Sequence, residues 1–422
     1  MKLTFKYKLE RLSNTKKEIL KELMWHTTKV YNMVLYEIRE GQVEIDENKS
    51  LNLASNPIYN YERKNNWHSK YLHSHTLQEV VINVVENYKS YKALEKKYNE
   101  NPESLKGKPR FPHFKSKPIQ AVLFTKYAIR RKGQKLMLSL SKEMQAKFKV
   151  KSLDIVIPRK LNTLVNLESI KQIRITIKNM EYIMEIIYER NEEKLDNTYT
   201  NIMAIDLGLN NIVACTNKEN NNSMLVSGKE LKSKNRYLNK EIERLRQIQM
   251  CMLKDSKKYK DTKRIKKLYE QRRNYIETYM HKVSKMVVEY AIENKCNTIV
   301  LGDIKDIKHK MDYNKNFVQI PLQNLVQKIE YKAKLKGIKV EKISEKYTSG
   351  VSSIDNEPIT KEYYNKKRRI SRGMFVTNEG KKINADINGS LNILRKYIAS
   401  KTKLEIVMNN GREQSPIKKR VA

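Results

Sequence analysis

The chain has 422 residues, of which 86 are Lys or Arg and 47 are Asp or Glu, so its formal net charge is +39. Hydrophobic residues make up 39% of the sequence, which is enough for a sizeable core and excludes a disordered basic tail. The surplus charge exceeds what a soluble surface needs, and a phosphate backbone neutralises such charge with a gain from counterion release. The composition therefore indicates a nucleic-acid-binding protein.

Other protein classes are excluded by what the sequence lacks. No apolar stretch reaches the roughly 18 residues of a membrane-spanning helix, and the first residues lack the apolar region of a signal peptide. The three cysteines, Cys215, Cys251 and Cys296, lie too far apart for a disulfide framework or a CxxC zinc site. The many Lys, Ile and Asn residues are typical of an AT-rich bacterial genome. We therefore expect a cytoplasmic, nucleoid-associated bacterial protein with no membrane partner.

The N-terminal half combines one strand, a helical block and several later strands. Apolar and polar residues alternate over 2–10, which predicts a strand, and helical spacing follows over 13–100. Strand patterns return at 121–130, 135–140, 169–177 and 181–189. We expect these strands to form a small antiparallel barrel into which the helical block is inserted.

From residue 201 the pattern changes to α/β. Strands are predicted at 201–206, 212–216, 223–227, 298–303 and 338–343, and helical segments at 229–294, 322–336 and 385–398. A polar segment, 347–382, precedes the last helix. The basic tail from Lys401 is expected to be frayed.

Two aspartates of the C-terminal half are candidates for chemistry. Asp206 ends an apolar strand, and Asp386 stands at the start of the last helix. Each one alone fits an ordinary structural role, a strand-end turn or a helix N-cap. Hydrolysis of a phosphodiester with two Mg²⁺ ions, however, needs acidic oxygens that converge from separate elements. In a chain that otherwise attracts phosphates, the pair predicts a metal-dependent nuclease site.

The stretches around these aspartates resemble a known family. Residues 204–208 (AIDLG) and 384–389 (NADING) are similar to the first and third RuvC motifs of the transposon-encoded TnpB nucleases and the miniature type V CRISPR effectors. Further similarities lie at 107–115 (GKPRFPHFK), 331–333 (YKA) and 345–349 (EKYTS). The order of the segments also matches, so the resemblance covers nearly the whole chain.

The resemblance implies an RNA-guided DNA endonuclease of α/β plus α+β multidomain fold. Its partners would be a guide RNA and target double-stranded DNA, next to a short motif that the protein reads in the duplex. Its cofactors would be two Mg²⁺ ions. The implied domains are a wedge β-barrel (1–12 and 106–200), a helical recognition domain (13–105), an RNase H-like RuvC nuclease domain (201–346 and 383–400) and a basic tail (401–422).

The second motif departs from the family. The family has a strand that ends in Glu followed by Asp, whereas here Gly302 stands in the Glu position and Asp303 follows it. Asp303 and Asp355 are equal candidates for the third catalytic and metal-binding carboxylate beside Asp206 and Asp386, and Glu357 ranks behind them.

The zinc element of the family is also altered. Its four cysteines correspond to Ser352, Asp355, Val376 and Glu379, so we expect no zinc. Residues 347–382 are interpreted as a target nucleic-acid-binding insertion that lacks zinc ligands and is held by packing.

Two other functions stay open at this point. Without a third acid the chain would be a nuclease-deficient, RNA-guided DNA-binding repressor. An RNase H-fold DNA transposase or resolvase would act without a guide. RNA bound to the purified protein would therefore distinguish the RNA-guided functions from this one. The sequence leaves open whether the chain is a CRISPR effector or a transposon nuclease, and whether it acts as a monomer or as a homodimer on one RNA.

Overall fold

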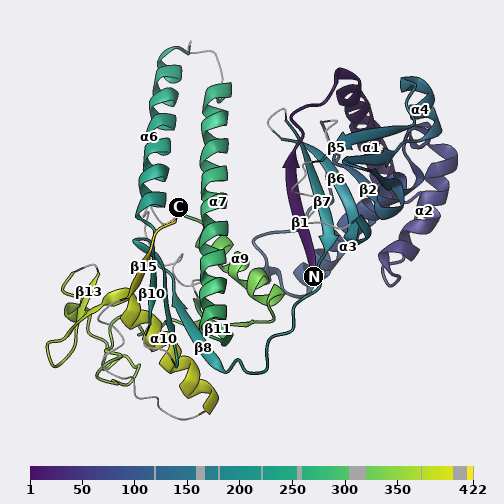
Figure 1. The fold of residues 1–422 in the computed structure, drawn as a ribbon. Helices are drawn as coiled ribbons and strands as arrows, with labels where there is room; N and C mark the ends of the chain where they lie inside the picture. Colours follow the sequence, from purple (N-terminus) through teal and green to yellow (C-terminus); the bar gives the residue numbers. More distant parts are fainter. Residues whose placement is uncertain are drawn as a thin grey trace. The chain divides into compact units, whose positions relative to one another are not determined.

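A computed structural model describes residues 1–117, 120–157, 167–178, 181–219, 222–253, 259–303, 320–371, 373–402 and 416–421. The chain divides into two compact units, Met1–Arg190 and Asn191–Ala422 (Figure 1). Within these residues, no helix combines the length and the apolar character that crossing a membrane would require.

The first unit contains the helices that the sequence predicts. They are α1 (Asn14–Arg39), α2 (Leu51–Asn65) and α3 (Ser74–Glu100). A short fourth helix, α4 (Lys142–Phe148), was not predicted. The side chain of Ser13 begins α1 because it accepts a hydrogen bond from the amide of Lys16. The apolar faces of α1 and α3 contribute to one core with the strands of this unit.

The strands of the first unit form two sheets. One has the order β1 (Lys2–Lys8), β7 (Glu181–Glu189), β6 (Ile170–Lys178), β2 (Val122–Thr125), and the other β3 (Ile129–Lys132), β4 (Lys135–Ser139), β5 (Ser152–Val156). The predicted alternation of residues 2–10 is confirmed by β1, whereas β5 was not predicted. Closure of these strands into one barrel stays a prediction.

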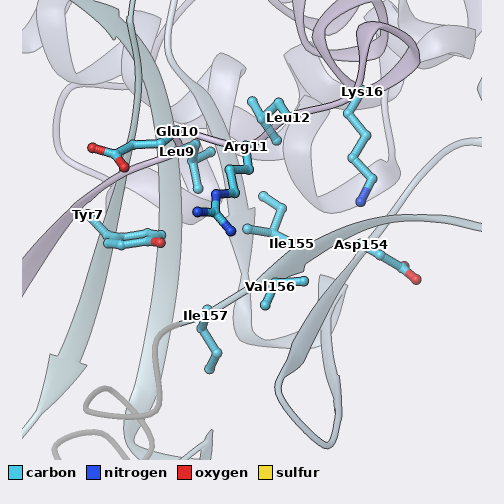
Figure 2. A pocket seen from close by; sticks show the side chains of 10 residues that line it. All are labelled: Tyr7, Leu9, Glu10, Arg11, Leu12, Lys16, Asp154, Ile155, Val156 and Ile157. Atoms are coloured by element: carbon cyan, nitrogen blue, oxygen red, sulfur yellow. The ribbon is translucent and has the colours of Figure 1, made fainter.

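A pocket of about 380 Å³ lies between the end of β1 and β5. Figure 2 shows the guanidinium of Arg11 extending into it, with Tyr7 on one side and Ile155 on the other. Lys16 adds a second cation to its lining. The pocket belongs to the first unit, whereas Asp206 and Asp386 belong to the second.

The second unit is built on a six-stranded sheet. Its order is β12 (Lys339–Ser344), β11 (Cys296–Asp303), β8 (Asn201–Asp206), β9 (Asn211–Asn217), β10 (Met224–Ser227), β15 (Ile417–Lys419). The five strands predicted after residue 201 are therefore confirmed. The edge strand β15 corrects the expectation of a wholly frayed tail, because it pairs in parallel with β10.

The two faces of this sheet are covered by different helices. Met203 and Ile205 of β8 pack with α7 (Lys263–Glu293) and α9 (Leu322–Leu335), whereas Ala204 packs with α10 (Ala385–Thr402). This alternation follows from the two-residue period of a strand. By the same period, Asp206 lies on the α10 face. The long helix α6 (Lys229–Cys251) packs beside α7, and a small hairpin, β13 (Met374–Val376) and β14 (Lys382–Asn384), precedes α10 (Figure 1).

Candidate catalytic site

Acidic residues gather at one edge of the sheet in the second unit. Asp206 is the last residue of β8, Asp303 is the last residue of β11, and Glu345 directly follows β12. These three strands are parallel neighbours, with Leu301 opposite Ile205 and Asp303 opposite Ser344. The carboxyl ends of parallel strands meet at the same edge, which is where α/β proteins place their sites.

Asp386 reaches the same edge from the first turn of α10. Asn384 caps this helix, since its side-chain oxygen accepts hydrogen bonds from the amides of Asp386 (3.0 Å) and Ile387 (3.2 Å). The Asp386 carboxylate accepts from the Asn211 amide at 2.8 Å and from the Arg369 guanidinium at 3.2 Å. Asp386 is thus free of the capping role and is oriented by β9 and by the 347–382 segment.

The environment of Asp206 favours its neutral form unless a cation is near. Burial, and then the charge of Asp386, raise the pKa of Asp206 to about 7, although Arg369 lowers it. Helix α10 comes very close, because a Cβ at Gly389 would lie 2.5 Å from Oδ2 of Asp206. Gly389 therefore makes room for this carboxylate, and the structure brings Asp206 and Asp386 together as the sequence predicts.

Glu345 is a member of this group that the site prediction missed. A Cβ built at Gly302 would lie 2.5 Å from both Cγ and Cδ of Glu345, and closer still to Oε1. The Glu345 side chain thus fills the space that a side chain at position 302 would enter. Burial, followed by the charges of Asp206 and Asp303, raises the pKa of Glu345 to about 8.

Helix α10 also fixes the loop that carries Glu345. The Glu345 carbonyl accepts from the amide (3.2 Å) and the hydroxyl (2.8 Å) of Thr348. The side chain of Asn392 donates to the Thr348 carbonyl at 2.9 Å, and Lys396 donates to the Ser344 carbonyl at 3.0 Å. The helix that begins with Asp386 therefore holds Glu345 in place as well.

Asp303 and Asp355, the two predicted third acids, lie in different surroundings. Asp303 lies close enough to Glu345 for its charge to raise the pKa of that residue. Asp355 and Glu357 both accept hydrogen bonds from Arg368, at 2.8 and 2.6 Å. Asp355 also accepts from the amide of Asn378 at 2.8 Å. These two acids are therefore engaged within the 347–382 segment.

Arg368 gives this segment more than packing alone. Its Nε donates to the Val376 carbonyl at 2.9 Å, and its guanidinium carbon lies 4.9 Å from the ring centre of Phe375. Two of the four positions that correspond to zinc cysteines, Asp355 and Val376, thus contact one guanidinium. An ion cluster around Arg368 therefore adds to whatever packing holds the segment, and the expectation that packing alone suffices stays a prediction.

The donor chemistry of the site fits a hard divalent cation. In the described part of the chain, no three His, Cys, Asp or Glu side chains already converge on one point as metal ligands do. The acids instead form charge-coupled pairs, Asp206 with Asp386 and Glu345 with both Asp206 and Asp303. Oε1 of Glu345 is buried without a hydrogen-bond partner in the structure. Clustered carboxylates whose charges repel one another, one of them with an oxygen that accepts no hydrogen bond, match the oxygen ligands that Mg²⁺ uses.

Two successive stretches of the chain match known protein families. Residues 185–308 match the OrfB_IS605 family, described as a probable transposase, and residues 323–393 match the Cas12f1-like TNB domain. The CRISPR-associated endodeoxyribonuclease Cas12f1 of Sulfoacidibacillus thermotolerans is 34% identical over 140 residues. That alignment spans 32% of this chain and 30% of the relative.

A solved structure shares the fold. The Cas12f1 chain of a Cas12f1-sgRNA-target DNA complex superimposes with a TM-score of 0.60 and 16% identity, over 89% of this chain and 82% of that one. The predicted resemblance is thereby confirmed, and the chain resembles the TnpB nucleases and the miniature type V effectors.

Proposed function

We propose that this chain, which resembles the TnpB nucleases and the miniature type V effectors, is an RNA-guided DNA endonuclease whose third catalytic carboxylate is Glu345. The observation that carries the proposal is the position of the Glu345 side chain over Gly302, beside Asp206. Position 302 is where the family places its second-motif Glu. A carboxylate thus reaches the same space from the end of the neighbouring strand.

In the proposed site, neighbouring residues orient the carboxylates of Asp386 and Glu345. Asp206, Asp386 and Glu345 would hold divalent cations, whose chemistry when bound is to activate water and to stabilise the leaving oxygen. Asn211 and Arg369 orient Asp386. Helix α10 orients Glu345 through Asn392 and Lys396. Asp303 would tune the charge of Glu345 from beside it, and Asp355 would serve the ion cluster around Arg368.

The proposed partners are a guide RNA and target double-stranded DNA. The net charge of +39 and the matching TNB domain support nucleic-acid binding, and the relative with the shared fold was solved with a guide RNA and target DNA. Base pairing with the guide would select the sequence, while the first unit would read a short motif in the adjacent duplex. The 347–382 segment would contact the target without zinc.

The guided repressor differs from this proposal only in the third acid. That alternative rests on Gly302, and Glu345 is the residue that would supply the missing carboxylate. A transposase that acts without RNA would carry no protected RNA after purification. Both alternatives are therefore separated from the proposal by the same two measurements, bound RNA and metal-dependent cutting.

The test begins with protein expressed together with its neighbouring genomic DNA. We expect it to purify with a nuclease-protected RNA of defined sequence and to cut a matching linear DNA in Mg²⁺. Asp206→Ala and Asp386→Ala should abolish cutting and leave guide-dependent binding intact, because phosphate contacts come from Lys and Arg elsewhere. Protein free of RNA, or variants that cut at the wild-type rate, would contradict the proposal.

A further inference from the structure

The C-terminal strand places a cation in the same cross-strand row as Asp206. Asp206 of β8 is opposite Ala214 of β9, Ala214 is opposite Leu225 of β10, and Leu225 is opposite Lys418 of β15. Residues in one such row share a face of the sheet. Ala214 and Leu225 both pack in the α10 core, which identifies that face. Lys418 therefore lies on the catalytic face, three strands from Asp206.

A cleft brings this strand together with two residues that hydrogen-bond to Asp386. It measures about 720 Å³, and its lining includes Asn211, the residue that donates to Asp386, and Asn384, the cap of α10. Its basic lining residues come from β15, from the residue after it and from the start of α6: Lys418, Lys419, Arg420 and Lys229. One acid, Glu230, also lines the cleft and accepts a hydrogen bond from the Tyr275 hydroxyl at 2.9 Å. Cations thus outnumber acids in a cleft that also contains the two asparagines that hydrogen-bond to Asp386.

We propose that β15 is a backbone clamp for the DNA strand that is cut, with Lys418 and Arg420 contacting its phosphates. This inference rests on the proposed function. Three strand spacings of about 4.8 Å place Lys418 about 14 Å from Asp206, so it would meet the backbone a few nucleotides from the cut bond. Arg420 lies two positions further along the chain and also lines the cleft. Two cations at this distance hold the strand in register while the carboxylates act at the bond.

The ordering of β15 also supports this role. Val421 is buried in the core on the other face of the sheet, so the residues just before it are fixed and do not trail in solvent. Strand β15 is held by its pairing with β10 and by the burial of Val421 directly after it. Lys418 and Arg420 therefore lose little backbone conformational entropy when they bind a ligand. Sequence composition alone gives no hint of this, because a basic chain end is typical of a frayed tail.

The test uses the full chain loaded with guide RNA. The double variant Lys418→Gln/Arg420→Gln is compared with Lys282→Gln/Lys285→Gln, which removes two exposed lysines from α7 on the opposite face. We expect the β15 variant to bind guide RNA and matching duplex as the wild type does, but to cut about tenfold more slowly near 0.15 M salt. The log–log salt slope of its affinity for a short single-stranded DNA should fall by about 1.4, since each lost contact removes about 0.7. The α7 variant should match the wild type in both assays.

Each other outcome separates the clamp from the proposed function. If the wild type cuts and the β15 variant cuts equally fast with an unchanged salt slope, the clamp is wrong and the endonuclease stands. If no protein cuts but only the β15 variant loses affinity for single-stranded DNA, the phosphate contacts of Lys418 and Arg420 stand, while the endonuclease and the role of β15 in cutting are wrong. Weakened guide RNA binding by the β15 variant would assign this strand to the guide and overturn the inference.

Discussion

The carboxylate of Glu345 fills the space that the first atom of a side chain at Gly302 would take. The two residues come from adjacent parallel strands, and Gly302 is opposite Ile343, two residues before Glu345. A side chain at 302 and the present Glu345 conformation therefore exclude each other. We interpret this relationship as relocation of an acid from the end of β11 to the end of β12.

The first prediction concerns Gly389, which faces Asp206 across the start of α10. Alanine raises intrinsic helix stability by about 1 kcal/mol relative to glycine, so Gly389→Ala would stabilise an unconstrained helix. Here the new Cβ would lie 2.5 Å from Oδ2 of Asp206 and must displace it. We expect guided cleavage to fall at least tenfold, with guide-dependent binding unchanged, because a small misplacement of a reacting group is costly.

Ser400→Ala, near the exposed end of the same helix, is the control for Gly389→Ala. It should leave the cleavage rate unchanged. Equal rates for wild type and Gly389→Ala would mean that the contact between α10 and Asp206 does not position this acid.

The second prediction concerns the ion cluster of the 347–382 segment. Arg368 and its partners Asp355 and Glu357 are mostly buried, so Arg368→Ala leaves two carboxylates without their cation. Breaking a buried pair in this way costs roughly 3–5 kcal/mol. Hydrogen exchange should therefore accelerate in β13 and β14. Arg368→Lys should not restore protection, since an ammonium cannot bridge both carboxylates and the Val376 carbonyl in the same plane.

The Lys381–Glu379 pair offers the matched comparison within this segment. Both side chains are largely exposed, and exposed pairs contribute about 0–1 kcal/mol. Lys381→Gln should leave exchange in β13 and β14 unchanged. If Arg368→Ala behaved as Lys381→Gln does, apolar packing would be sufficient to hold the segment.

The third prediction concerns pH and a buried acid of the first unit. Burial, and then the neighbouring Glu37 carboxyl, raise the pKa of Glu62 to about 8, although Asn66 donates to it at 2.5 Å. The unfolded chain releases this proton near its ordinary value of 4.5, whereas the folded chain keeps it up to about pH 8. Between these values the folded state binds the extra proton, so stability falls as pH rises and levels off above pH 8.

Glu62→Gln removes this titration while keeping a neutral side chain of the same shape. We expect the difference in unfolding midpoint between Glu62→Gln and wild type, measured by thermal unfolding of the full chain, to grow in favour of the variant from pH 5 to pH 8. Glu40→Gln, at the exposed end of α1, should follow the wild type throughout. A difference that is constant across this range would show that Glu62 does not bind the proton.

The positions of Asp206 and Asp386 at the ends of their elements could be predicted because their signals are local. The apolar strand ends at Asp206, and the last helix begins at Ala385, so both acids lie at predictable ends of elements. The presence of Glu345 in the site was not predicted, because it depends on which strands are neighbours and in what register they pair. Local periodicity carries no such information. Two features of the sequence, taken together, could have indicated Glu345. They are the unexpected glycine at position 302 and an acid directly after the next predicted strand.

The same distinction explains the other differences. Strand β5 has five residues and follows the seven-residue helix α4, so neither is long enough for a clear period. Strand β15 has three residues in a basic segment, and it is stabilised by pairing with the edge of β10, which local periodicity does not reveal. The ion cluster around Arg368 joins residues 355, 357 and 376, which no spacing rule predicts.

The most direct test of the central claim measures guided cleavage by wild type, Glu345→Gln and the double variant Gly302→Glu/Glu345→Gly. Glu345→Gln keeps the shape and removes the charge, so it should cut as poorly as Asp206→Ala while binding its target normally. The double variant moves the acid to position 302 and clears the space it needs, and it should recover much of the lost rate. A Glu345→Gln variant that cuts as fast as wild type would contradict the account.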